Sequence, residues 1–371
     1  MSEATATPES RADLPSPSPS VDPAETAAAS GKTAGPGRLS WWHGDGGEGA
    51  RRNLGLIAVL VVLVVIGAAT RSDLYSNPDW VWNNTLTILK LASVVGVVTV
   101  GMTFVIIGGG IDLSVGAIVA LAGVWCTTVA TQSYGAGGMI FSALTVGVAV
   151  GLVNGLLVSY GRLVPFIATL AMMVAARGLA AEISDKQTQV SNNVFINDIA
   201  STKLLGIPLL VYILAAVVAA GWVLLNRTTF GRRTVAVGGN PEAARLAGIN
   251  VRRHTVLLYA LSGLCCGIAA VMLTAQANSA QAAMANLYEL DAIAAAIIGG
   301  TLLSGGRGTI VGSLLGVLIF STITNLFAIN GLSTEAQNMV KGGIIVGAVL
   351  VQQVQFRSLT QFLGRNRATT V

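Results

Sequence analysis

The feature that most constrains this chain is a series of long apolar runs, which begins at Asn53 and continues almost to the C-terminus. A helix needs about 20 apolar residues to cross a bilayer. Lipid offers no partner to backbone polar groups, and barrel strands alternate polar with apolar residues, so continuous runs such as residues 57–66 predict helices. The predicted spans are residues 53–70, 85–107, 114–132, 138–160, 164–183, 207–225, 254–276, 288–304, 308–328 and 336–355. The sequence therefore predicts an all-α polytopic membrane protein with about ten transmembrane helices.

Composition excludes several other classes of protein. Only 11% of the residues are charged, against roughly 25% in a soluble domain, which excludes a water-soluble globular enzyme. The net charge is +5, but the 22 Lys and Arg residues are dispersed among apolar segments, so no nucleic-acid partner is expected. The cysteines lie in apolar runs without metal-ligand spacing, and we expect buried thiols and no metal site. They are Cys126, Cys265 and Cys266.

Charge distribution predicts the orientation in the membrane. The loop at residues 226–253 carries six arginines against one acidic residue, Glu242, and basic loops remain in the cytoplasm. With ten spans, Arg51, Arg52 and the arginines of the C-terminal tail fall on the same side as this loop. Both termini are therefore expected in the cytoplasm.

The first 52 residues differ in composition from the rest of the chain. Six of the ten prolines lie among them and no apolar period is visible, which predicts a disordered cytoplasmic tail over residues 1–52. Gly31-Lys32-Thr33 ends like a phosphate-binding loop, but Thr26 stands where that motif requires a glycine, so no nucleotide site is expected. These polar residues also form a stretch much longer than the short basic n-region of a signal peptide, so no cleaved signal peptide is expected. Residues 53–355 form the predicted transmembrane domain, and residues 356–371 a cytoplasmic tail.

A weak internal repeat is visible in the membrane domain. The segment Ile106–Gly110 is echoed by Ile297–Gly300, and the spacing of Gly151 and Gly155 is echoed by Gly312 and Gly316. Glycine-rich membrane sequence also produces such echoes by chance. If the repeat is genuine, it predicts two loosely repeated halves with broken helices near a pore between them.

Two segments interrupt the apolar pattern in ways that suggest function. At residues 108–116, three glycines precede Asp112, which is placed to accept hydrogen bonds from the free amides of the next helix. This segment is either a plain capped turn or a broken helix whose backbone lines a polar cavity. At residues 238–250, Asn240 and Pro241 begin a short helix that Gly248 ends. Such a helix docks against a partner or lies on the lipid headgroups.

These segments resemble one known family, the ribose/xylose/arabinose-type ABC importer permeases. The resemblance covers residues 53–355 in family order, and only the long N-terminal tail departs from the usual pattern. The runs that carry it are Gly-Gly-Gly-Ile-Asp-Leu-Ser-Val-Gly at 108–116, Pro165–Leu170 with Arg177–Leu179, the loop at 238–250, and the segment from Tyr288 to Thr301.

The resemblance implies a multi-pass subunit of a bacterial inner (plasma) membrane importer. It would pair with a second permease copy, as a homodimer, and receive sugar from an extracytoplasmic binding protein. A cytoplasmic ATPase with two nucleotide-binding domains would bind ATP and Mg²⁺, so this chain itself needs no cofactor and carries no catalytic residue. The helix at 241–249 would be the coupling helix that seats in that ATPase. Its coupling residues would be Asn240, Pro241, Glu242, Arg245, Leu246 and Gly248.

Polar residues inside the membrane are functional candidates because burying them in lipid is costly. Arg177 lies twelve residues beyond Pro165, about 18 Å along a helix, and shares a helical face with Phe166, Thr169 and Met173. Phe166 and Thr169 either contact a sugar ring and its hydroxyls or pack between helices, with Arg177 snorkelling or paired to an acid. The predicted translocation-path residues are Asp112, Ser114, Phe166, Thr169, Arg177 and Asn325. Glu289 and Asp291 are expected near the outer mouth or as docking residues for the binding protein.

Three other functions remain as alternatives. A permease of the branched-chain amino-acid ABC class shares the same membrane plan, and an ion-coupled secondary transporter shares the polytopic architecture. An intramembrane enzyme is disfavoured, because the only histidines are His43 and His254 and no catalytic motif accompanies them. The long arginine-rich loop with its capped helix favours the ATP-driven permease.

Overall fold

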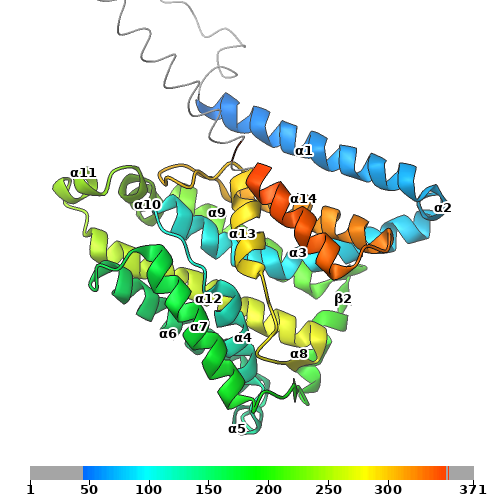
Figure 1. Ribbon diagram of the computed structural model, residues 1–371, viewed down its shortest axis with the longest axis horizontal. Helices are drawn as coiled ribbons and strands as arrows, with labels where there is room; N and C mark the ends of the chain where they lie inside the picture. The colour runs from blue at the N-terminus through cyan, green and yellow to red at the C-terminus, as the bar shows by residue number, and fades with distance from the viewer. Residues whose placement is uncertain (1–44, 348–349, 351–371) are drawn as a thin grey trace, which may run out of the picture. The chain divides into compact units, whose positions relative to one another are not determined.

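The computed structural model describes residues 45–347 and residue 350 (Figure 1). The predicted C-terminal tail and most of the predicted N-terminal tail lie outside the described residues. The chain divides into two units, residues 1–48 and 49–371, and the candidate membrane spans, the first of which is Arg51–Thr70, lie in the second unit.

Seven helices within the described residues are long and apolar enough to cross a membrane. All seven overlap spans that the sequence predicts, and the first begins earlier than expected, inside the predicted tail. They are α1 (Asp45–Thr70), α3 (Pro78–Ile107), α6 (Gly135–Ser159), α7 (Pro165–Ile183), α9 (Leu209–Arg227), α12 (Val251–Ala277) and α14 (Ile310–Ile329). The predicted helical class and most of its spans are therefore confirmed.

Two predicted spans are wrong in length. The span predicted at 114–132 is helix α4 (Val115–Cys126), which ends where Thr127 Oγ1 donates to the Gly123 carbonyl over 2.9 Å. The span predicted at 288–304 is helix α13 (Tyr288–Ile298), which ends at Gly299 before the left-handed Gly300. Both helices are too short to cross a bilayer alone. The last predicted span, 336–355, is helical over residues 334–347 and then leaves the continuously described part of the chain.

Short elements connect these helices. Two antiparallel pairs of two-residue strands, which the sequence does not predict, tie loops together. The short helices are α2 (Ser72–Tyr75), α5 (Val129–Gln132), α8 (Val194–Ser201), α10 (Thr229–Gly239) and α11 (Pro241–Leu246). The strand pairs are β1 (Gln189–Val190) with β4 (Ser279–Ala280) and β2 (Lys203–Leu204) with β3 (Ile207–Pro208).

Helix α3 forms the centre of the membrane unit, since 83% of its most apolar 18-residue segment is buried. It packs against α9, α12, α13 and α14. The main core cluster contains Met102 and Ile106 of α3 together with Cys265 and Cys266 of α12 and Cys126 of α4. All three cysteines are buried and free, as the sequence predicts.

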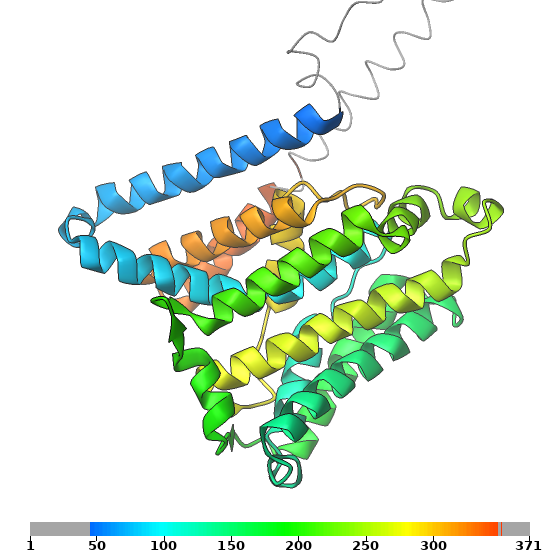
Figure 2. The ribbon, with the colours of Figure 1, turned by 180° about the vertical axis from the view of Figure 1, so that it is seen from behind.

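Helix α6 lies along α12 through a contact built from glycines (Figures 1 and 2). A β-carbon at Gly147 would lie 2.9 Å from the backbone nitrogen of Gly267, and one at Gly151 would overlap the Tyr259 carbonyl. The glycines in this contact are Gly147, Gly151 and Gly155 on α6 and Gly263 and Gly267 on α12. Small residues of this kind let membrane helices approach backbone to backbone.

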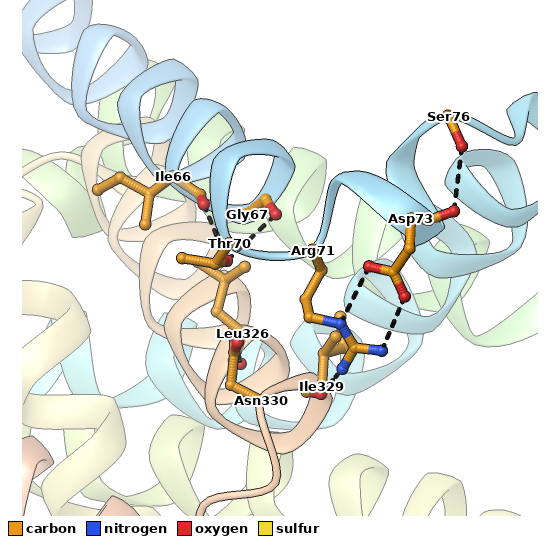
Figure 3. A network of polar contacts seen from close by, with 9 residues as sticks. All are labelled: Ile66, Gly67, Thr70, Arg71, Asp73, Ser76, Leu326, Ile329 and Asn330. Carbon is orange, nitrogen blue, oxygen red and sulfur yellow. Dashed lines mark hydrogen bonds and ion pairs between the residues drawn. The ribbon is translucent and has the colours of Figure 1, made fainter.

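Helix α1 is held mainly at its two ends, and only 11% of its apolar window is buried. At the start, Arg52 Nη2 donates to Thr309 Oγ1 over 3.1 Å. At the end, Arg71 lies between Asp73 and the C-terminus of α14, where its Nη1 donates to the Ile329 carbonyl over 2.6 Å (Figure 3). The bond from Arg71 lowers the pKa of the Asp73 carboxyl. Between these anchors α1 packs only through one narrow stripe, from Leu56 to Gly67.

We expect Gly151→Ala to lower the thermal stability of the detergent-solubilised protein, because the added methyl group must push α6 away from α12. Overpacking of this kind costs about 1–3 kcal/mol. Gly137→Ala is the matched control, since Gly137 lies on the same helix and has open space at its β-carbon position. Melting temperatures measured by scanning fluorimetry should fall only for Gly151→Ala, and equal values for both variants would contradict the glycine contact.

Candidate functional site

The site is built around the break between α3 and α4. Helix α3 ends at Ile107, and the Gly110 amide returns to the Val105 carbonyl over 2.9 Å. Gly109 has a φ of 83°, in the left-handed region that glycine adopts without a steric cost. The three consecutive glycines therefore let the chain turn sharply while its backbone stays hydrogen-bonded. This is an ordinary glycine-containing helix end, and whether it is part of a broken helix that lines a cavity stays a prediction.

Asp112 lies in this break and is fully buried. Its Oδ1 accepts from the Ser114 amide over 3.0 Å and from Ser114 Oγ over 2.6 Å. Its Oδ2 accepts from Ser262 Oγ of α12 over 3.1 Å. Asn154 of α6 completes the group by donating from Nδ2 to Ser114 Oγ over 2.8 Å. We call Asp112, Ser114, Asn154 and Ser262 the polar cluster; it joins the break to α6 and α12.

The sequence predicts only part of this cluster. Asp112 was expected to accept from the free amides of the next helix, but it accepts the amide of Ser114, the N-cap residue itself, and α4 has no side-chain cap. Asn154 and Ser262 were missed, although each is a polar residue inside an apolar run and so carries the signal that marks functional candidates. Asn154 Oδ1 is buried without a hydrogen-bond partner. Which side chains meet depends on the packing of α6 and α12, which the sequence does not contain.

The carbonyl of Ile111, next to Asp112, is held from two other helices. Tyr259 Oη of α12 donates to it over 3.2 Å, and Thr169 Oγ1 of α7 lies 3.3 Å away in donor position. Thr169 is fully buried, whereas Phe166 of the same helix is 51% exposed. The two residues were predicted to share a face, but a spacing of three residues leaves their directions about 60° apart. The structure therefore brings Thr169 to the break and leaves Phe166 on the outer surface of α7.

Arg177 of α7 is tied to the loop before α13. Its Nη1 donates to the carbonyls of Ala282 over 2.8 Å and Met284 over 3.2 Å. Glu289 of α13 interacts electrostatically with Arg177 and is buried, with its Oε2 lacking a hydrogen-bond partner. A β-carbon at Gly116 would lie 2.5 Å from that Oε2. Glycine at position 116 thus provides the space in which the carboxylate of Glu289 lies.

The remaining predicted polar residues lie in α13 and α14. Asp291 forms an ion pair with Lys341 over 3.2 Å, and both side chains are mostly buried. Lys341 was missed, although a charged residue inside a predicted apolar span carries the same signal as Asn154 and Ser262. Asn325 of α14 is buried, and its Oδ1 has no hydrogen-bond partner. A docking role of Glu289 and Asp291 toward a binding protein stays a prediction.

The predicted helix in the basic loop is present as α11, which ends at Leu246 and is shorter than expected. Asn240 Oδ1 accepts from the amides of Glu242 over 3.1 Å and Ala243 over 2.9 Å, so the predicted cap is confirmed. Glu242 pairs with Arg245 over 2.6 Å on the exposed surface, and this bond lowers the pKa of the Glu242 carboxyl. Leu246 is 75% exposed.

A cavity of about 340 Å³ lies between the break and the start of α11. Its lining includes Gly109, Pro165, Pro241, Tyr259 and Ser304, and none of the residues that line it carries a charge. The cavity shows that the break and the loop around α11 face one another. Within the described residues, no group of three His, Cys, Asp or Glu side chains is arranged to hold a metal ion.

We expect Asp112→Ala to destabilise the protein more than Asp112→Asn. Alanine leaves buried donors of Ser114 and Ser262 unsatisfied, at about 1–3 kcal/mol for each lost partner, whereas asparagine retains an acceptor at the same place. Asp198 is exposed on α8, and its replacement by alanine serves as the control. Thermal unfolding of the three purified variants checks the order, and equal melting temperatures for Asp112→Ala and Asp198→Ala would contradict a structural role of the cluster.

Comparison with known proteins extends over most of the chain. Residues 84–349 match the family model described as "Branched-chain amino acid transport system / permease component". The chain is 41% identical over 321 residues to the ribose import permease protein RbsC of Bacillus subtilis (strain 168), covering 82% of this chain and 94% of that protein. It is 39% identical over 300 residues to the ribose import permease protein RbsC of Escherichia coli (strain K12), covering 80% and 92%.

A relative with another sugar in its name is also similar. The L-arabinose ABC transporter permease protein AraH of Azospirillum brasilense is 35% identical over 300 residues, covering 81% of this chain and 87% of that protein. No solved structure matches the chain. The residues that match the family model include the break, the polar cluster and the loop around α11. The chain therefore belongs to the family of membrane permease components of ABC transport systems.

Proposed function

We propose that this chain is the permease subunit of an ABC importer that translocates a monosaccharide, a pentose or a hexose, delivered by an extracytoplasmic binding protein. The similarity to ribose and arabinose import permeases over most of both chains supports the substrate class. The observation that carries the mechanism is geometric. An exposed, capped helix, α11, lies across a cavity of about 340 Å³ from the break between α3 and α4, in which Asp112 is buried.

Helix α11 is the docking point for a separate ATPase, which binds ATP and Mg²⁺ and supplies the driving force. The six-residue helix is held rigid by Asn240 at its start, and Gly248, with a φ of 83°, lets the chain turn after its end. Glu242, Arg245 and Leu246 are exposed and free to contact another chain. The permease itself contributes binding and movement, and the hydrolytic chemistry belongs to its partner.

The translocation path follows the buried polar residues near the break. Asp112, Ser114 and Thr169 fix the position of the break, because each is hydrogen-bonded within the protein and buried. Phe166 is exposed on α7 and offers an apolar ring to a sugar or to a second copy of the chain. Arg177, which donates to the carbonyls of Ala282 and Met284, and the buried Glu289 add polar groups beside α4. A homodimer with the path between its two copies suits this arrangement.

The orientation follows from the same loop. If α11 meets an ATPase, the basic segment 226–253 and both termini lie in the cytoplasm, as the arginine distribution also predicts. The ATPase reaches one side of the bacterial inner membrane, and the binding protein reaches the other. The outer ends of α13 and α14, near Asp291 and Lys341, are then the side from which sugar enters.

A branched-chain amino acid is the second candidate substrate, because the description of the matching family names that class. Labelled ribose, arabinose, galactose and leucine offered to cells that express the chain with its ATPase and binding protein separate the two. We expect accumulation of a sugar that persists when an uncoupler collapses the ion gradient and stops when ATP is depleted. Leucine accumulation would replace the sugar proposal, and collapse with the uncoupler would favour an ion-coupled transporter.

We expect Leu246→Glu to reduce both co-purification with the ATPase and sugar uptake at least about tenfold, which corresponds to about 1.4 kcal/mol of binding free energy. A charge in place of the exposed leucine removes apolar contact area from the docking surface. Leu205→Glu is the matched control, because Leu205 is 89% exposed in the turn between β2 and β3. Normal association of Leu246→Glu would show that α11 does not dock the ATPase.

A further inference from the structure

Three separate segments of the membrane unit meet through glycine backbones beside the cavity. Gly109 belongs to the break, Gly238 to the last turn of α10, and Gly305 and Gly306 to the loop between α13 and α14. A β-carbon at Gly305 would lie 2.8 Å from the Gly238 carbonyl oxygen and 3.0 Å from the Gly109 Cα. We call these four residues the glycine junction. Figures 1 and 2 both show the loop between α13 and α14 reaching α10.

The junction is fixed by backbone bonds and by backbone conformation. The Gly306 amide donates to the Ile107 carbonyl at the end of α3 over 2.8 Å. Gly109, Gly305 and Gly306 have φ values of 83°, 82° and 76°, which other L-residues rarely adopt. A β-carbon at Gly238 would overlap the Ile107 carbonyl oxygen and lie 2.8 Å from the Gly306 amide nitrogen. The contact therefore leaves no space for a side chain.

The junction connects the exposed loop around α11 to the break between α3 and α4 and to the loop between α13 and α14. Helix α10 runs directly into α11, since the Asn240 amide bonds to the Ala236 carbonyl over 3.0 Å and Asn240 caps α11. The break leads within three residues to Asp112 and the polar cluster. The loop of Gly305 and Gly306 leads to the start of α14. A displacement of α11 thus reaches the two short-helix regions, α4 and α13, through one contact.

Contact between backbones transmits displacement more directly than contact between side chains. A side chain at an interface changes rotamer and so absorbs part of a movement, whereas close-packed backbone has no such freedom. Packed contacts of this kind shift between discrete arrangements instead of deforming gradually.

We propose that Gly238 is a positioning residue for transport: it keeps α10 and α11 in backbone contact with the break and with the loop between α13 and α14, so that all three segments move as one block. This inference rests on the proposed docking of the ATPase at α11. It adds the route by which that docking reaches the polar cluster and α14.

The neighbouring glycine provides a matched control. A β-carbon at Gly239 would meet only the Gly306 Cα, at 4.0 Å, which is an ordinary contact. We expect Gly238→Ala to retain co-purification with the ATPase and the basal ATP hydrolysis of the complex. Sugar uptake should fall at least about tenfold, which corresponds to about 1.4 kcal/mol of activation free energy. Stimulation of hydrolysis by the binding protein should also be lost. Gly239→Ala should match the wild type in all measurements. A smaller loss of uptake in folded Gly238→Ala would overturn the proposal.

A second measurement leaves the junction intact and decides the question if Gly238→Ala fails to accumulate. Spin labels at Ala247→Cys and Ser304→Cys report the distance between α11 and the loop between α13 and α14; both positions are exposed, and the native cysteines are buried. In the full complex, ATP binding should change this distance by less than half a helical turn, about 2.7 Å. A larger change would show that the segments move separately and would overturn the proposal that they move as one block.

These outcomes distinguish the inference from the function on which it rests. If Leu246→Glu keeps its association with the ATPase, the docking proposal fails whatever Gly238→Ala does. If Leu246→Glu loses association while Gly238→Ala transports normally, docking stands and the junction is not the route.

Discussion

The structure depends on the requirement that backbone polar groups inside a membrane find partners within the protein. Long helices meet it by themselves, but the interruption after α3 does not. There the Ile111 carbonyl accepts from Tyr259, and the Asp112 carboxylate accepts from Ser114 and Ser262. Two of these partners, Tyr259 and Ser262, come from α12, so the break depends on α12 lying beside it. The glycine contact that brings α6 against α12 completes the enclosure by placing Asn154 next to Ser114.

The two kinds of glycine in this chain serve different purposes. Gly147 and Gly151 have ordinary helical conformations and are small because another backbone passes close to them. Gly109 and Gly300 have positive φ values and end helices α3 and α13. The echo between the two halves of the sequence includes both of the latter, so the local geometry repeats at these two ends. Two repeated halves of the whole membrane unit stay a prediction.

Much of the fold could be predicted from length and hydropathy, because a spanning helix needs little more than a long apolar run. Hydropathy does not show where the backbone leaves the helical conformation within an apolar run. For this reason α4 and α13 are shorter than predicted. The capped helix α11 was predictable from Asn240 and Pro241, since its signals are local. The partners of Asp112 were not, because Asn154 and Ser262 lie 42 and 150 residues away along the chain and meet it only through helix packing.

The attachment of α1 has a consequence for how its sequence can vary. A helix that packs along its length is selected for shape at every turn, but α1 is joined by Arg52 near one end and Arg71 just beyond the other. Between them α1 buries a single stripe, which contains Leu56, Leu60, Leu63 and Gly67, while the other positions between Leu56 and Gly67 are exposed. Outside that stripe the middle of α1 needs only to be apolar and helical, so the information specific to this protein is concentrated in the stripe and the two ends.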